Sequence, residues 1–167
     1  MLFRSTYTVT ATGQDGCAGT ADVIVAVQGA GSPPGVPPPN DDPCQAMLLS
    51  VGNESCSRTG ATNAHATASS VAVPYRCAAT STSGSPSGGY QGGDVWFRCV
   101  VPASGIVVVA TYETTGPTDL ALEAYSGTCS NLQSLVCVDD VSPSHTMPVL
   151  PLTGLSPGQT VWIRAWE

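Results

Sequence analysis

Apolar and small polar residues alternate along most of this chain, with the two-residue period of a β-strand. Residues 6–12 and 21–27 alternate β-branched or aromatic side chains with small ones, and the Gly-rich run between them suits a hairpin loop. Further short apolar runs follow, separated by turns rich in Gly, Pro, Asn and Ser. They predict strands at residues 46–51, 61–68, 95–101, 106–112, 120–125, 135–138, 147–152 and 161–166.

No segment has the 3.6-residue apolar period of a helix, so an all-β fold is expected. The long run of residues 78–93 is rich in Ser and Gly and is predicted to form a surface loop. Many short strands with this punctuation favour an antiparallel β-sandwich or a jelly-roll-like domain.

A proline-rich stretch divides the chain into two unequal β-patterned parts. Prolines between residues 30 and 43 favour an extended polyproline II path, which makes a semi-rigid spacer; recognition by an SH3-like partner is the alternative. We therefore expect a terminal β-hairpin at residues 1–29, a linker at 30–43 and a β-sandwich domain at 44–167. A lone hairpin is marginally stable in water, and the pattern stops inside the strand 161–166. The N-terminal hairpin and the strand 161–166 are therefore each expected to need a further strand, from missing sequence or from another chain.

Two predicted strands carry the same pattern of aromatic and basic residues. In the segment 95–101, Trp96 and Arg98 fall on the face opposite the apolar residues, and Trp162, Arg164 and Trp166 repeat this arrangement. We expect the two faces to stack as a cation–π ladder on a sheet surface. The alternative is a binding surface for sugar or protein, formed by the rings of Trp96, Trp162 and Trp166.

Composition and charge limit the cellular compartments and binding partners that we expect. All five basic residues are arginine, and twelve carboxylates leave a formal charge of −7, so a phosphate backbone would be repelled and nucleic acid is not expected. Seven cysteines in a lysine-free, hydroxyl-rich chain indicate an oxidising compartment, and we expect a secreted, extracellular or cell-surface protein. No apolar run approaches the length of a membrane span, and the first residues do not form a signal peptide.

Two resemblances follow from the phrases in the sequence. The segment Thr6-Tyr-Thr-Val-Thr-Ala-Thr12, with the loop that follows it, resembles the last hairpin of Ig-like and PKD-like repeats of large bacterial surface proteins. Residues 40–167 are similar to pre-peptidase C-terminal-like (PPC-like) β-sandwich modules of secreted and surface bacterial proteins. That resemblance implies a non-catalytic accessory module that lacks its last strand here. The phrases that carry it include Asn40-Asp-Asp-Pro-Cys44, Gly92-Gly-Asp-Val-Trp-Phe97, Val101-Pro-Ala-Ser-Gly105 and Val136-Cys-Val-Asp-Asp140.

The cysteines are expected to form disulfides, because no spacing typical of a zinc site or a redox pair occurs. Local rings favour Cys44 with Cys56 and Cys129 with Cys137, and Cys77 with Cys99 would then form a third bridge, although other connectivities stay open. Cys17 remains, and is expected to be unpaired or to form an intermolecular bond.

Acidic side chains are candidate metal ligands, and the two histidines are candidate catalytic groups. Asp119, Asp139 and Asp140 lie at predicted strand ends, and calcium is the metal that would suit such oxygen ligands; Asx-turns are the alternative role, and no other cofactor is expected. A hydrolase would have to use His65 or His145, and neither accompanies a nucleophile elbow. We therefore expect no enzyme activity.

Two functions remain from the sequence. The first is a non-catalytic structural or adhesive segment of a large secreted bacterial surface protein. In its sharper form the chain is a fibre subunit that assembles with other copies of itself, or with neighbouring domains, by β-strand complementation, through the N-terminal hairpin or the strand 161–166. The alternative is an accessory module of a secreted hydrolase that binds a carbohydrate or protein substrate.

Overall fold

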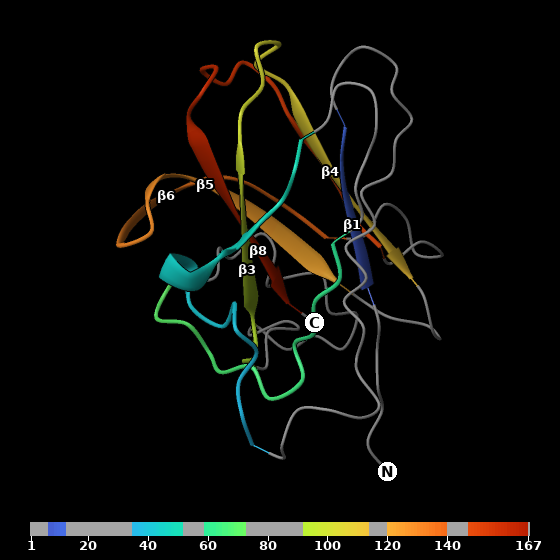
Figure 1. The fold of residues 1–167 in the computed structure, drawn as a ribbon, viewed down its shortest axis with the longest axis vertical. Helices are drawn as coiled ribbons and strands as arrows, with labels where there is room; N and C mark the ends of the chain where they lie inside the picture. The colour runs from blue at the N-terminus through green and yellow to red at the C-terminus, as the bar shows by residue number, and fades with distance from the viewer. Residues whose placement is uncertain are drawn as a thin grey trace, which may run out of the picture.

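The strands of the protein form two β-sheets in a computed structural model, which describes residues 7–12, 35–51, 59–72, 92–113, 120–139 and 147–166 (Figure 1). A single-turn 3₁₀-helix, η1 (Pro43–Gln45), precedes the second strand. In this part of the chain no helix is long and apolar enough to cross a membrane. The strands are β1 (Tyr7–Thr12), β2 (Met47–Leu48), β3 (Val95–Val100), β4 (Val107–Glu113), β5 (Ala121–Thr128), β6 (Asn131–Val138), β7 (Val149–Leu152) and β8 (Thr160–Trp166).

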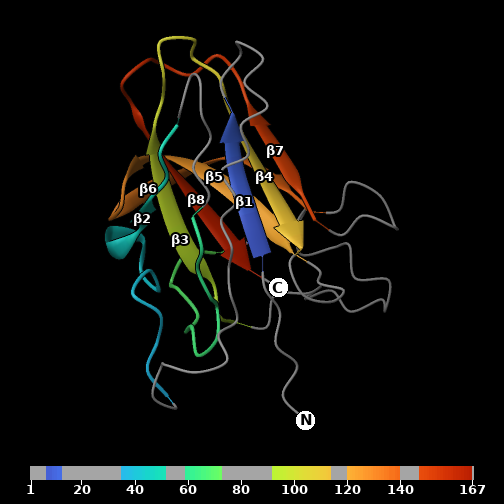
Figure 2. The same ribbon diagram turned by 45° about the vertical axis from the view of Figure 1, so that its right-hand side comes forward.

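The smaller sheet has the strand order β1-β4-β7, and the larger has the order β2-β3-β8-β5-β6. All neighbouring strands are antiparallel except β2 and β3, which pair in parallel over two residues. Figure 2 shows β1, β4 and β7 on one side of the molecule, with the larger sheet behind them. The expected all-β class is confirmed.

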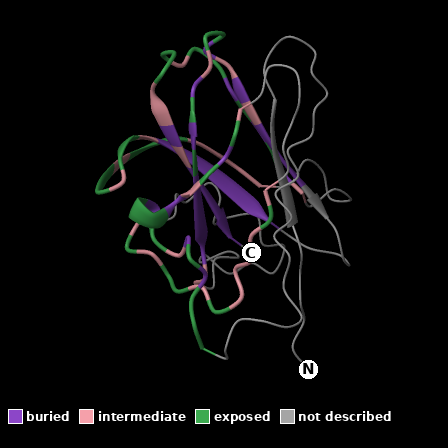
Figure 3. Cartoon of the chain, in the orientation of Figure 1, coloured by how far each residue is buried: buried purple, intermediate pink, exposed green. Residues whose placement is uncertain are grey.

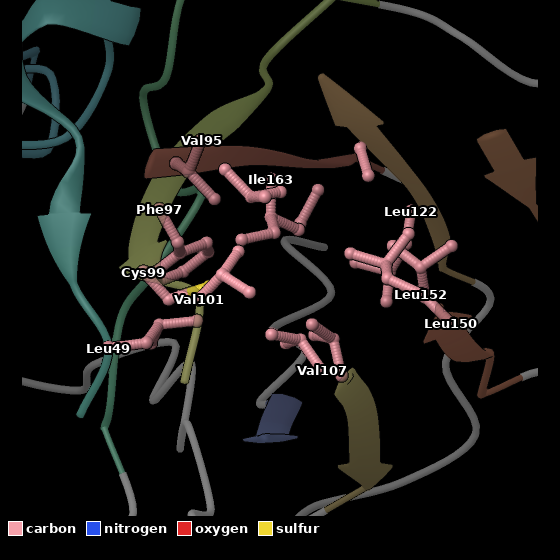
Figure 4. Close-up of a cluster of buried hydrophobic side chains, with 14 of the residues drawn as sticks. Leu49, Val95, Phe97, Cys99, Val101, Val107, Leu122, Leu150, Leu152 and Ile163 are labelled. Carbon is pink, nitrogen blue, oxygen red and sulfur yellow. The ribbon is translucent and has the colours of Figure 1, made fainter. Parts of the chain in front are cut away.

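One hydrophobic core lies between the two sheets. Val107 and Val109 of β4 and Leu150 and Leu152 of β7 meet apolar side chains of the larger sheet, such as Leu122. Figure 4 shows Leu150 and Leu152 of the smaller sheet beside Leu122 of the larger one. Since apolar burial contributes about 25 cal/mol per Å², this shared core is the main reason for the sheets to associate.

The larger sheet is buried on both faces over part of its area, as the purple ribbon of β5 and β8 shows (Figure 3). Alternate residues of β3 and β8 face the shared core, including Phe97 and Ile163, while Trp96 and Arg164 lie on the opposite face. This confirms the alternation predicted for residues 95–101 and 161–166. We call the face of the larger sheet that points away from the shared core the outer face.

Strand β8 lies in the middle of the larger sheet, between β3 and β5. Its residues pair with β3 from Thr160 to Ala165 and with β5 from Trp162 to Trp166. The expectation that residues 161–166 form an open sheet edge is therefore wrong. The physical reason is that both faces of β8 carry groups that need burial, so a central position satisfies them.

The N-terminal strand joins the smaller sheet. β1 pairs with β4 over six residues, from Tyr7 opposite Glu113 to Thr12 opposite Val108. The second strand of the predicted hairpin, residues 21–27, lies outside the described residues. Within the expected linker, Asn40 packs against β3: its carbonyl accepts from the Trp96 amide at 2.8 Å, and its side-chain amide donates to the Trp96 carbonyl at 3.1 Å.

One predicted strand is wrong. Residues 61–68 form a turn and an extended segment without strand pairing. The Ala64 amide donates to the Thr62 hydroxyl at 3.0 Å, and the Ala66 amide donates to the Asn63 carbonyl at 2.9 Å. His65 has the left-handed φ of 65°, which a regular strand does not contain. Local hydrogen bonds of Thr and Asn thus replace the strand that the apolar alternation predicted.

Candidate functional site

A buried carboxylate organises the outer face. Asp94 lies at the start of β3 and is completely buried. Its Oδ2 accepts hydrogen bonds from Trp96 Nε1 at 2.8 Å and from Arg164 Nε at 3.0 Å, and its Oδ1 accepts from the Ser69 amide at 2.8 Å. Three donors thus surround one carboxylate, which offsets the cost of removing its charge from water.

Arg164 of β8 is the counterion of Asp94, and its side chain is also fully buried. Its guanidinium carbon lies 5.6 Å from the ring centre of Trp96 and 5.2 Å from that of Trp166, and Nη1 donates to the Val71 carbonyl at 2.9 Å. Part of the predicted cation–π ladder therefore exists, with Arg164 between two indole rings, but it is buried rather than on a sheet surface, and Arg98 takes no part in it. Such contacts, together with an ion pair, hold a charge that would otherwise be costly to bury.

Glu123 is a second buried carboxyl group next to the ion pair. In the strand register it lies opposite Arg164, so Trp96, Arg164 and Glu123 form one row across three strands. The hydroxyl groups of Tyr125 and Ser134 donate to its two oxygens. Burial raises the pKa of Glu123, although these two hydrogen bonds and Arg164 oppose the shift. The pKa of Tyr125 is also raised, first by its own burial and then by Glu123.

Residues 66–72, which we call the covering segment, lie over this row. The segment is attached by the bonds from Ser69 to Asp94 and from Arg164 to Val71. At its start, the amide and hydroxyl of Thr67 donate to the two oxygens of Asp41 at 2.6 and 2.7 Å. Val71 packs against a small apolar cluster on the outer face, made by Ala46, Trp96 and Tyr125 with Leu132 and Trp162.

A disulfide fastens the other side of this arrangement. Cys44 in η1 is bonded to Cys129, which lies in the two-residue turn between β5 and β6. Gly127 makes this turn possible, because its φ is 96° and a side chain there would collide with the Asn131 carbonyl. A cavity of about 310 Å³ adjoins the disulfide; its walls include Asp42, Ser69, Ser70, Val71, Ser130 and Leu132.

The predicted cysteine pairs are wrong. Cys44 is bonded to Cys129, so neither the Cys44–Cys56 nor the Cys129–Cys137 pair forms. Cys137 is also in a disulfide. Cys99 is a free, buried thiol in the shared core, so it is not bonded to Cys77. Short rings favoured the local pairs in sequence, but the fold brings η1 to the β5–β6 turn across 85 residues. Cys17, Cys56 and Cys77 lie outside the described residues.

The predicted aromatic binding surface is only partly accessible. Trp96 and Trp166 are buried, so their rings are not exposed for stacking on a ligand. Trp162 is half-buried, and it lies opposite the exposed Arg98 in the β3–β8 register. Trp96 packs with Val71 of the covering segment, whereas Trp166 packs with Ala121 and Cys137. Of the predicted Trp/Arg surface, Trp162 and Arg98 stay accessible.

Two of the three predicted calcium ligands lie outside the described residues. Asp119 and Asp140 lie outside the described residues, and Asp139, which is described, is half-buried just after β6. Within the described ranges, no group of three His, Cys, Asp or Glu side chains could hold a metal ion. Calcium at Asp119, Asp139 and Asp140 stays a prediction. His65 lies exposed in the turn described above, and His145 lies outside the described residues.

No protein-family model, curated protein or solved structure matches the chain. The role of these residues therefore has to be argued from their geometry. The Trp/Arg pattern of the sequence pointed to Arg164 and its tryptophans but not to Asp94. The signal that could have identified it is its place two residues before Trp96, because side chains two apart in a strand share a face.

Proposed function

We propose that this chain is a non-catalytic structural or adhesive segment of a large secreted bacterial surface protein. The observation that supports this most is the complete burial of the groups best suited to chemistry. Asp94 and Arg164 have no exposed surface, and Glu123 is buried beside them. Asp94 is hydrogen-bonded to Arg164, Arg164 contacts the Trp96 ring, and Glu123 accepts a hydrogen bond from Ser134. Such groups stabilise a fold and have no surface left for a substrate.

The finer architecture that we propose is a PPC-like β-sandwich. Two sheets that share one core, with a disulfide closing the outer face, are consistent with that architecture. The Cys44–Cys129 bond also favours an oxidising compartment, because disulfides are rare where thiols are kept reduced. The proposed location is therefore extracellular or on a cell surface.

We further propose that the chain assembles with copies of itself by exchange of β1. The strand is at the edge of its sheet among the described residues, and 22 residues separate its end at Thr12 from the next described residue, Gly35. A long connection allows the same strand to pair with its own β4 or with the β4 of a neighbour. β8 is not a candidate for this exchange, since it is central in the other sheet.

Engineered cysteines test the exchange. Thr10 and Ala110 are opposite each other in the β1–β4 register. A mixture of the single variants Thr10→Cys and Ala110→Cys, refolded together and oxidised, is expected to give a covalent dimer that contains one chain of each kind. A mixture of Thr10→Cys with Leu135→Cys, an exposed position in the other sheet, is the control and should give no such product. Strand exchange is rejected if the first mixture stays monomeric while a Thr10→Cys/Ala110→Cys double variant closes its own bridge.

An accessory module that binds a carbohydrate or protein substrate is the second candidate. One observation favours it, namely that Arg98 and part of Trp162 stay accessible on the outer face. Saturable binding of a glycan or peptide that is lost in Trp162→Ala, with folding unchanged, would support this function. Assembly of the chain without any binding of a glycan or peptide would support the structural function instead.

A further inference from the structure

The accessible part of the outer face combines apolar side chains with one cation. Leu48 of β2 and Val100 of β3 are 51% and 47% exposed, which is unusual for large aliphatic side chains in a strand. Arg98 lies opposite Leu48 in the β2–β3 register and opposite Trp162 in the β3–β8 register. Residues opposite each other, or two apart, share a face. Leu48, Arg98, Val100 and Trp162 therefore form one surface, which we call the Arg98 patch.

The charge of the patch contrasts with the rest of the chain. The whole chain carries a net charge of −7, and the structure describes only two of its arginines. Arg164 is neutralised by Asp94 inside the protein. Arg98 is exposed, and among the described residues its guanidinium takes part in no hydrogen bond or ion pair. A planar guanidinium in this setting matches a carboxylate, which it can bind through two parallel hydrogen bonds.

The backbone beside the patch is largely paired within the protein. The Leu49 amide donates to the Arg98 carbonyl at 2.8 Å, and Leu49 itself is buried in the shared core. The Val101 amide donates to the Gln159 carbonyl at 2.9 Å, and the Val101 carbonyl accepts from Gly158 at 2.9 Å. A ligand is therefore expected to contact the side chains of the patch rather than to extend the sheet.

We propose that the Arg98 patch binds an extended, acidic segment of a protein. A carboxylate of the segment bonds to Arg98, and an apolar side chain two residues away, on the same face of the extended segment, packs between Leu48 and Val100. An acidic polysaccharide would satisfy the guanidinium, but it offers no aliphatic side chain for the two exposed aliphatic residues. The patch lies on the larger sheet, so its test is independent of β1 exchange.

Binding of dye-labelled nine-residue peptides to the full chain, followed by fluorescence anisotropy, tests the proposal. The probes repeat Ser-Val-Ser-Glu (the Val/Glu peptide), Ser-Val-Ser-Lys (the Val/Lys peptide) or Ser-Val-Ser-Ser, so that Val and the varied residue share one face of the extended peptide. We expect the Val/Glu peptide to bind most tightly, because it alone supplies both the carboxylates and the apolar side chains. Arg98→Glu and Val100→Glu should each weaken that binding about tenfold or more, the factor expected for a lost charged hydrogen bond or an introduced repulsion.

A matched control separates the patch from general charge effects. Val149→Glu introduces the same charge at a valine of β7 that is 43% exposed on the smaller sheet, and it should change the affinity less than twofold. Each variant is checked for an unchanged urea midpoint. The proposal is overturned if the Val/Glu peptide binds no better than the Val/Lys peptide, or if Val149→Glu weakens binding as much as Val100→Glu. Binding of polygalacturonate that depends on Arg98, without binding of the peptide, would assign the patch to an acidic glycan instead.

Discussion

Asp94→Asn should be among the most destabilising single substitutions in the larger sheet. The change keeps the shape of the side chain but removes the negative charge beside Arg164, while an amide group replaces one oxygen that now accepts a hydrogen bond. Because both side chains are fully buried, Arg164 would lose its ion-pair partner inside the protein, and Glu123 would be the carboxyl group left near it. Breaking one partner of such a buried pair costs about 3–5 kcal/mol, a large share of a typical domain stability of about 5–15 kcal/mol.

Urea unfolding followed by tryptophan fluorescence, under non-reducing conditions, measures this loss. With a typical slope of about 2 kcal/mol per molar urea, the midpoint should fall by about 1.5–2.5 M. Asp42→Asn is the control: Asp42 is exposed, and it caps η1 by accepting from the Cys44 amide at 2.8 Å. Asn caps helices about as well as Asp, so that midpoint should hardly move.

A double variant sharpens the interpretation. Arg164→Met in the Asp94→Asn background removes the unpaired charge, and it should restore part of the lost stability although it changes a second buried residue. The reasoning is refuted if Asp94→Asn costs less than about 1 kcal/mol, the typical value for one neutral hydrogen bond, or if the two substitutions are simply additive.

Three further predictions concern the disulfide, the second carboxyl group and the free thiol. Cys44→Ser with Cys129→Ser opens a ring of 85 residues, and the chain-entropy relation gives a loss of about 4.5 kcal/mol in urea unfolding. Burial raises the pKa of Glu123 in the folded state, so the folded protein binds more protons and its unfolding free energy should fall as pH rises above the unfolded value. Glu123→Gln should remove that part of the pH dependence, measured from pH 4 to 8. Burial raises the pKa of Cys99 to about 12, so iodoacetamide should label this thiol at pH 8 only after unfolding, as peptide mapping can show.

Each of these predictions has a contrary result. Cys99→Ala removes a sulfur atom without breaking a disulfide. The disulfide argument fails if the double serine variant is no less stable than this control. An unchanged pH profile in Glu123→Gln would mean that the carboxyl group does not titrate differently in the two states. Labelling of Cys99 in the folded protein at the rate of a free thiol would contradict its place in the core.

Periodicity in the sequence predicted most of the described strands and the buried faces of β3 and β8. The alternation in residues 95–101 correctly separates Phe97 from Trp96, because a strand must direct neighbouring side chains to opposite sides. The same rule failed at residues 61–68, where Thr62 and Asn63 bond locally. Local hydrogen bonds compete with strand pairing without changing the apolar pattern.

The sequence alone did not predict the long-range contacts. The Cys44–Cys129 bond and the Asp94–Arg164 pair join residues 85 and 70 positions apart. Their partners depend on strand order, and adjacent strands in space need not be adjacent in the chain. The most useful local clue was the repeated Trp/Arg pattern, which identified Arg164 as part of a ladder. It could not show that a covering segment would bury that ladder and leave Arg98 accessible.

The central position of β8 has a consequence for biosynthesis. Both β3 and β5 are made before β8, yet each needs β8 as its hydrogen-bonded neighbour. Until residues 160–166 are available to the folding chain, the larger sheet is split, with Trp96 and Leu122 unable to reach their final surroundings. Pairing over such sequence separations is slow, so this interval is when the emerging chain most needs protection by a chaperone.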